Sequence, residues 1–223
     1  MNAAEIALFV IPIIIAITFH EAAHGFVALH FGDPTARDAG RVTLNPLRHI
    51  DLVGTIIIPV LLFLTAGFLF GYAKPVPVNY SLLRNPRWNM IWVAAAGPGM
   101  NILLALVSAI LVSGVGAIDG ENGAMIGNAL LLSIDLNLIL AIFNMLPLPP
   151  LDGSKVIAAF LPAALVRPYL SFGRYGMAVL LLLLFVAPVL AARNGINFDI
   201  FNWLVIAPAA AIKQTLLSLF GPG

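Results

Sequence analysis

The chain has 223 residues, of which 61% are hydrophobic and only 9% carry a charged side chain, and its formal net charge is +1. The mean hydropathy of +1.02 is typical of a protein with several membrane-spanning segments and excludes an ordinary water-soluble domain. The small net charge argues against nucleic acid as a partner, and the lack of cysteine excludes disulfides and thiolate metal sites.

Long apolar runs predict how the chain crosses a membrane. They cover residues 5–31, 52–72, 89–115, 124–147, 174–192 and 198–219. Several approach or exceed the ~20 residues that a helix needs to span a bilayer. Short connections and the lack of an internal repeat predict a single membrane-embedded domain over residues 1–223. We expect an all-α polytopic membrane protein with five to six transmembrane or re-entrant segments and a small extended or β insert.

Lysine and arginine residues predict the orientation of these segments. The stretches 32–51, 73–88 and 148–174 each carry three basic residues, whereas 116–123 carries none. Because basic loops stay on the cytoplasmic side, we expect the N-terminus outside and the first run crossing inward. The run 52–72 has basic flanks on both sides. A re-entrant hairpin would resolve this conflict, and a true span that breaks the charge rule is the alternative.

A His-Glu-Ala-Ala-His pentad lies inside the first apolar run. On a helix, His20 and His24 project from one face, where both imidazoles can bind a single zinc ion. Glu21 lies beside them, where its carboxylate could take a proton from a metal-bound water. Histidines that merely pack in a core are the alternative, but such histidines need no neighbouring glutamate. Because ionisable groups are costly at membrane depth, the pentad predicts a functional site.

A zinc ion held by two histidines needs a third protein ligand and an open position for water. Asp152 is the strongest candidate, because three prolines within residues 147–150 exclude regular helix just before it. The predicted topology brings Asp152 to the same leaflet as the histidine pair. Two alternatives stay open: Asp152 as a helix N-cap, and His49 or Asp51 as the third ligand.

Three ordered motifs make the chain resemble the site-2 protease family of intramembrane zinc metalloproteases. These are the pentad at residues 20–24, the sequence GPGMN at 97–101, and the stretch 144–153 that ends in Leu-Asp-Gly. The resemblance covers about residues 1–160, the expected catalytic core, which is followed by helices at about 174–219. It is strongest to compact prokaryotic members without a PDZ or CBS domain.

The resemblance implies His20, His24 and Asp152 as ligands of one zinc ion per chain, Glu21 as catalytic base, and Asn144 as a substrate or oxyanion contact. It implies hydrolysis of peptide bonds within or next to transmembrane helices of substrate proteins. With the charge pattern, it predicts a multi-pass protein of the plasma or inner membrane with its active site toward the cytoplasmic leaflet. A zinc-binding transporter or scaffold without proteolytic activity is the alternative.

Three other polar features of the apolar segments have open roles. Asn101 is expected to hydrogen-bond across helices or to contact the site. Asp135 is expected to form a buried polar pair or to admit water. The extended segment 75–79 could pair with an unwound substrate strand or act as a rigid gate.

Overall fold

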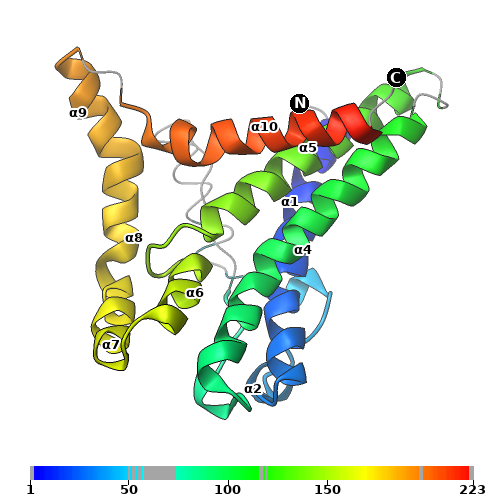
Figure 1. Ribbon diagram of the computed structural model, residues 1–223. Helices are drawn as coiled ribbons and strands as arrows, with labels where there is room; N and C mark the ends of the chain where they lie inside the picture. Colours follow the sequence, from blue (N-terminus) through cyan, green and yellow to red (C-terminus); the bar gives the residue numbers. More distant parts are fainter. Residues whose placement is uncertain are drawn as a thin grey trace.

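The computed structural model describes residues 3–49, 51, 54, 57, 74–115, 118, 120–195 and 198–220 (Figure 1). Their elements are α1 (Ala3–His30), α2 (Thr35–Asp38), η1 (Pro46–Arg48), η3 (Tyr80–Leu82), α4 (Pro86–Val115), α5 (Glu121–Asn144), α6 (Asp152–Phe160), α7 (Ala163–Ser171), α8 (Gly173–Leu181), η4 (Leu182–Val186), α9 (Ala187–Arg193), η5 (Asn202–Ile206) and α10 (Ala207–Phe220). No β-strand occurs within these described ranges. The predicted all-α class is confirmed.

Five helical segments of the described chain are long and apolar enough to cross a membrane. They are Val10–His30, Pro86–Val115, Glu121–Asn144, Gly173–Arg193 and Asn202–Phe220. They match five of the six predicted runs, so the chain is a multi-pass membrane protein. The sixth run, 52–72, lies almost wholly outside the described residues, and its re-entry stays a prediction.

The centre of the fold is the packing of α4 against α1 and α5. Ala28 of α1 packs with Val93 of α4, while Ala105 and Ala109 of α4 pack with Ile134 of α5, and all five are buried. Lipid tails are as apolar as these side chains, so membrane helices associate through close packing and interhelical hydrogen bonds. Small residues at the contacts allow that close approach.

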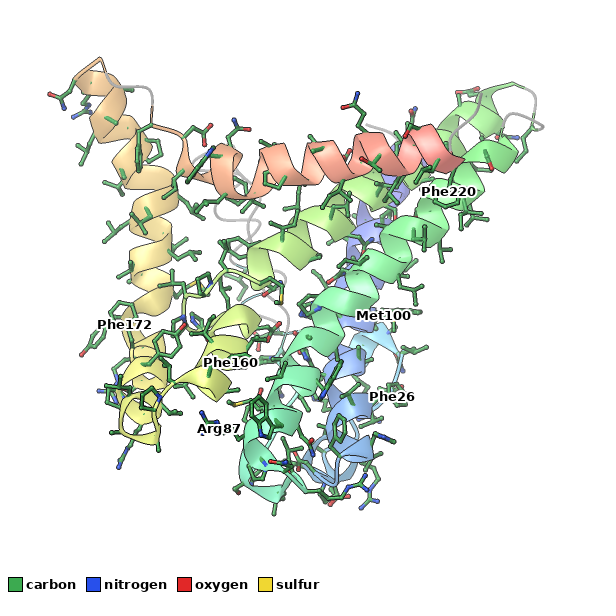
Figure 2. The ribbon with its side chains drawn as sticks, in the orientation of Figure 1. Phe26, Arg87, Met100, Phe160, Phe172 and Phe220 are labelled. Carbon is green, nitrogen blue, oxygen red and sulfur yellow. The ribbon has the colours of Figure 1, made fainter. Side chains whose placement is uncertain are left out.

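Helix α6 is fixed against the first turn of α4. The Nε of Arg87 donates a hydrogen bond of 2.6 Å to the carbonyl oxygen of Ala159. The rings of Trp88 and Phe160 meet edge to face, with centroids 5.9 Å apart. Figure 2 shows Arg87 and Phe160 where the two helices approach each other. These contacts hold the whole of α6, and therefore its first residue, relative to α4.

The C-terminal helices are arranged around this centre. In Figure 1, α8 and α9 stand apart from α1 and α4, and α10 runs across α5 from the side of α9. Lys213 of α10 and Asp135 of α5 form an ion pair, with Nζ 2.7 Å from Oδ2. The expectation of a polar pair at Asp135 was right, but its burial was not, because the aspartate side chain is 44% exposed.

The insert before α4 is tied to the end of α1. Residues 74–79 have no regular secondary structure, so this extended segment pairs with no described strand. Asp33, which is fully buried, accepts hydrogen bonds from the backbone nitrogens of Thr35 at 2.9 Å and Asn79 at 2.7 Å. One carboxylate therefore holds both the turn after α1 and the end of the insert.

Replacing Asp33 with alanine should loosen this insert. The variant leaves the Asn79 amide without its acceptor, which costs about 1–3 kcal/mol when such a group stays buried. We expect a lower thermal midpoint in detergent and faster amide exchange at residues 79–82. Asp38→Ala is the matched control, because Asp38 is paired only with its exposed neighbour Arg37. Equal effects of the two substitutions would contradict the anchoring role of Asp33.

Candidate metal centre

Two distant parts of the chain meet in a buried cluster. His20 and His24 lie one turn apart on α1, and Asp152 is the first residue of α6; their exposed fractions are 6%, 8% and 5%. In the part of the chain that the structure describes, these three form the group of histidine and acidic side chains that could hold a metal ion. The structure thus brings together the three predicted ligands, while their role as ligands stays a prediction.

The three facing atoms form a nearly equilateral triangle. The Nε2 atoms of His20 and His24 are 3.1 Å apart, and they lie 3.3 Å and 3.2 Å from Oδ2 of Asp152. Ligand atoms around a tetrahedral zinc ion, each bound at about 2.0–2.1 Å, are about 3.3–3.4 Å apart. The spacing therefore suits three of the four positions of such a site.

Hydrogen bonds behind the imidazoles determine which nitrogen faces the cluster. The Nδ1 of His24 is 2.7 Å from the carbonyl oxygen of Val93, which can only accept, so Nδ1 carries the hydrogen. The Nδ1 of His20 is 2.5 Å from Oδ1 of Asn101. In the neutral rings both Nε2 lone pairs then face a carboxylate oxygen. Three electron-pair donors repel one another at this distance, and a cation bound among them would replace that repulsion with attraction.

Asn101 takes both roles that the sequence left open. Its Nδ2 donates to the carbonyl oxygen of Ala16 at 3.2 Å and to Oδ1 of Asn137 at 2.8 Å, which leaves its own Oδ1 to accept from His20. The Asn137 Nδ2 in turn donates to the carbonyl oxygen of Ser133 at 2.8 Å. This buried chain links α1, α4 and α5, and it orients a predicted ligand at the same time.

Gly97 gives the cluster its space. A Cβ at this position would lie 2.5 Å from Nε2 of His24 and 2.6 Å from Nε2 of His20. Real Cβ atoms do not approach other atoms so closely, and the two imidazoles are already held from behind. The backbone of α4 can lie against the predicted ligand atoms only because residue 97 is glycine.

The turn between α5 and α6 delivers Asp152. The sequence left an N-cap role open, but the N-cap of α6 is Leu151, and the Asp152 carboxylate turns toward side chains. A Cβ on Gly153 would overlap the carbonyl oxygen of Met145, so the chain can fold back on itself here only with glycine. The prolines predicted to interrupt the helix do lie in this turn, at residues 147–150.

Lys155 is a neighbour of the cluster that the sequence did not single out. Its Nζ lies 2.7 Å from Oδ1 of Asp152. Burial is the largest single influence on the Lys155 ammonium and lowers its pKa, but the charge of Asp152, together with the other acidic groups nearby and the hydrogen bond to Asp152, raises the pKa above its ordinary value. The spacing of three residues between Asp152 and Lys155, at the start of a helix, is the sequence feature that could have indicated this ion pair.

Glu21 is held by the insert. Its Oε2 accepts a hydrogen bond of 2.8 Å from the backbone nitrogen of Val76. The flanking Pro75 and Pro77 have no N–H, so Val76 supplies the donor of this tripeptide. With that N–H engaged and two prolines beside it, the segment is poorly equipped to pair with a substrate strand. Of the two roles predicted for this segment, the rigid gate fits these contacts better.

The other predicted residues lie apart from the cluster or have other partners. Asn144 ends α5, and its Nδ2 donates to the carbonyl oxygen of Leu140 at 3.0 Å. The Nε2 of His49 bonds to the carbonyl oxygen of Thr43 at 2.9 Å. Oδ1 of Asp51 accepts a hydrogen bond of 2.7 Å from the backbone nitrogen of Gly54. Neither reserve ligand belongs to the converging group among the described residues.

Gly97→Ala should abolish metal binding. The added methyl group would push α4 away from the imidazoles, and we expect the metal content of the purified protein to fall from about one ion per chain to near zero. Gly99→Ala is the matched control, since a Cβ at 99 meets nothing within 4 Å. Both changes raise helix propensity, so a loss confined to residue 97 reports the steric contact. Metal content measured by elemental analysis decides the matter, and full retention by Gly97→Ala would contradict the geometry.

The chain is similar to known proteins along most of its length. The profile of Peptidase family M50 matches residues 8–125, more than half of the chain. The "Putative zinc metalloprotease YwhC" of Bacillus subtilis (strain 168) is 41% identical over 184 residues, covering 81% of this chain and 80% of that protein. Rip2 of Mycobacterium tuberculosis (strain ATCC 25618 / H37Rv), which bears the same description, is 28% identical over 191 residues, covering 86% of this chain and 70% of that protein. No solved structure matches the chain significantly. The chain therefore belongs to peptidase family M50, the site-2 protease family of membrane metalloproteases.

Proposed function

We propose that this membrane peptidase hydrolyses peptide bonds within or next to transmembrane helices of membrane-protein substrates. The observation that carries the proposal is that His20 and His24 belong to the candidate span Val10–His30. A hydrolytic centre on a membrane-spanning helix can reach only those segments of a substrate protein that lie in or beside the membrane. The family membership and the names of YwhC and Rip2 support zinc as the cofactor, one ion per chain.

The residues of the cluster have distinct roles in this proposal. His20, His24 and Asp152 hold the ion through the three atoms that face each other. When bound, zinc supplies Lewis acidity toward the scissile carbonyl and lowers the pKa of a water molecule. Glu21 accepts the proton of the attacking water and delivers it to the leaving amide nitrogen. The hydrogen bond from the Val76 amide to Oε2 keeps that carboxylate turned in one direction during both transfers.

Asn144 is the proposed contact for the substrate carbonyl. An amide N–H directed at the oxygen of a tetrahedral intermediate stabilises the charge that develops there. Its Nδ2 now donates to Leu140 of its own helix, so contact with substrate requires a rotation of this side chain. Asn144 ends α5 directly before the turn that carries Asp152, which keeps the two residues on one structural unit.

We further propose that residues 1–223 act as one domain whose active site opens toward the cytoplasmic leaflet. In Figure 1, α2, the start of α4 and α7 lie at one end of the bundle, and the end of α4 and the start of α5 lie at the other. The first end carries the basic stretches of the sequence, including Arg37, Arg84 and Arg167. Basic loops are retained in the cytoplasm, which supports this orientation.

Glu21→Gln should separate metal binding from catalysis. The amide cannot accept the water proton, so we expect a loss of cleavage of about 10²–10⁴-fold while zinc content stays at about one per chain. Asp152→Ala should lose the zinc. Glu121→Gln, at the exposed start of α5, is the matched control and should keep both properties.

The readout is the set of new peptide ends in membranes from cells that express each variant, identified by mass spectrometry. Ends that map within or beside predicted transmembrane helices, present with the wild type and absent with Glu21→Gln, are the expected result. The proposal fails if Glu21→Gln cleaves like the wild type, or if the ends map only to soluble domains.

A further inference from the structure

The two oxygens of Asp152 have different partners. Oδ2 faces the Nε2 atoms of His20 and His24 at 3.3 Å and 3.2 Å. Oδ1 is 2.7 Å from Nζ of Lys155, one turn further along α6. The carboxylate is therefore divided, with one oxygen in the cluster and the other bound to an ammonium group.

This division matters because a carboxylate can bind a metal through one oxygen or through both. A catalytic zinc site has three protein ligands and keeps a position open for water or substrate. A second Asp152 oxygen turned into the cluster would compete for that position. An ammonium group at 2.7 Å makes a charge-assisted hydrogen bond, which is shorter and stronger than a neutral one.

The surroundings strengthen this bond. The Asp152 side chain is 7% exposed and that of Lys155 is 29% exposed. The other described lysine–carboxylate pair, between Lys213 and Asp135, has the same 2.7 Å separation but a more exposed carboxylate at 44%. Because screening by water weakens exposed pairs, the pair at Asp152 is the more effective at holding its partner.

We propose that Lys155 is a positioning residue that binds Oδ1 of Asp152, so that Asp152 enters the metal centre through Oδ2 alone and a coordination position stays open. The inference rests on the proposed metal centre. Lys155 acts only through Asp152, as groups behind metal ligands commonly do when they orient them. Arginine can replace the donor, whereas methionine matches the length of the side chain without its charge.

The test uses cobalt(II) in place of zinc in the full-length protein in detergent. Visible absorption of cobalt(II) loses intensity when its coordination number rises above four. The wild type, Lys155→Arg and Lys213→Met should give an intense four-coordinate spectrum. Lys155→Met should still bind about one ion but show a several-fold loss of intensity, because both Asp152 oxygens become available. Lys155→Gln is the second variant if Lys155→Met is not recovered from membranes.

The outcomes separate this inference from the metal centre itself. A Lys155→Met spectrum equal to that of the wild type, with equal cobalt content, would overturn the role of Lys155 and leave the centre intact. Wild-type protein that takes up no cobalt would overturn the centre and the inference together. Loss of intensity in Lys155→Met with recovery in Lys155→Arg supports positioning, since a side chain that only filled space would not be rescued by a longer cation.

Discussion

Three electron-pair donors confined within 3.3 Å of each other are the constraint on which this structure depends. Two imidazole nitrogens and a carboxylate oxygen repel one another unless a cation lies among them, and the repulsion is large in a buried, weakly screened place. Such a cluster persists in a membrane helix only where the surrounding chain holds each member in position. The helices and turns around the cluster provide this support.

Each member of the cluster is held through its other polar atom. The imidazoles donate from Nδ1 to Asn101 and to the carbonyl oxygen of Val93, and Asp152 accepts from Lys155 through Oδ1. These partners come from α4 and α6. The same hydrogen bonds therefore hold the helices together and orient the side chains of the cluster. In hydrocarbon an unsatisfied polar group is costly, which couples the orientation of the site to the association of the helices.

Glycine and proline determine how closely the elements approach. Gly97 lets the backbone of α4 lie against the imidazoles, and Gly153 lets the turn after α5 fold back on Met145. The prolines of the insert leave Val76 as the amide that meets Glu21. The proposed base and the proposed ligands are thus positioned by the backbone as much as by side chains. A backbone contact allows less adjustment than a contact made by a long side chain.

The sequence by itself determined the features that depend on local pattern. Apolar runs of spanning length predicted five of the membrane segments, and the i, i+4 spacing placed His20 and His24 on one helix face. The third member, Asp152, followed from its setting after a proline-rich turn. Only the tertiary structure decided what depends on contact between distant segments: the bond from Asn101 to His20, the hold of the insert on Glu21, and the exposed position of the Asp135 pair. Periodicity tells which face of a helix is apolar, but it does not tell which neighbour that face will meet, because the neighbour is chosen by packing across the whole bundle.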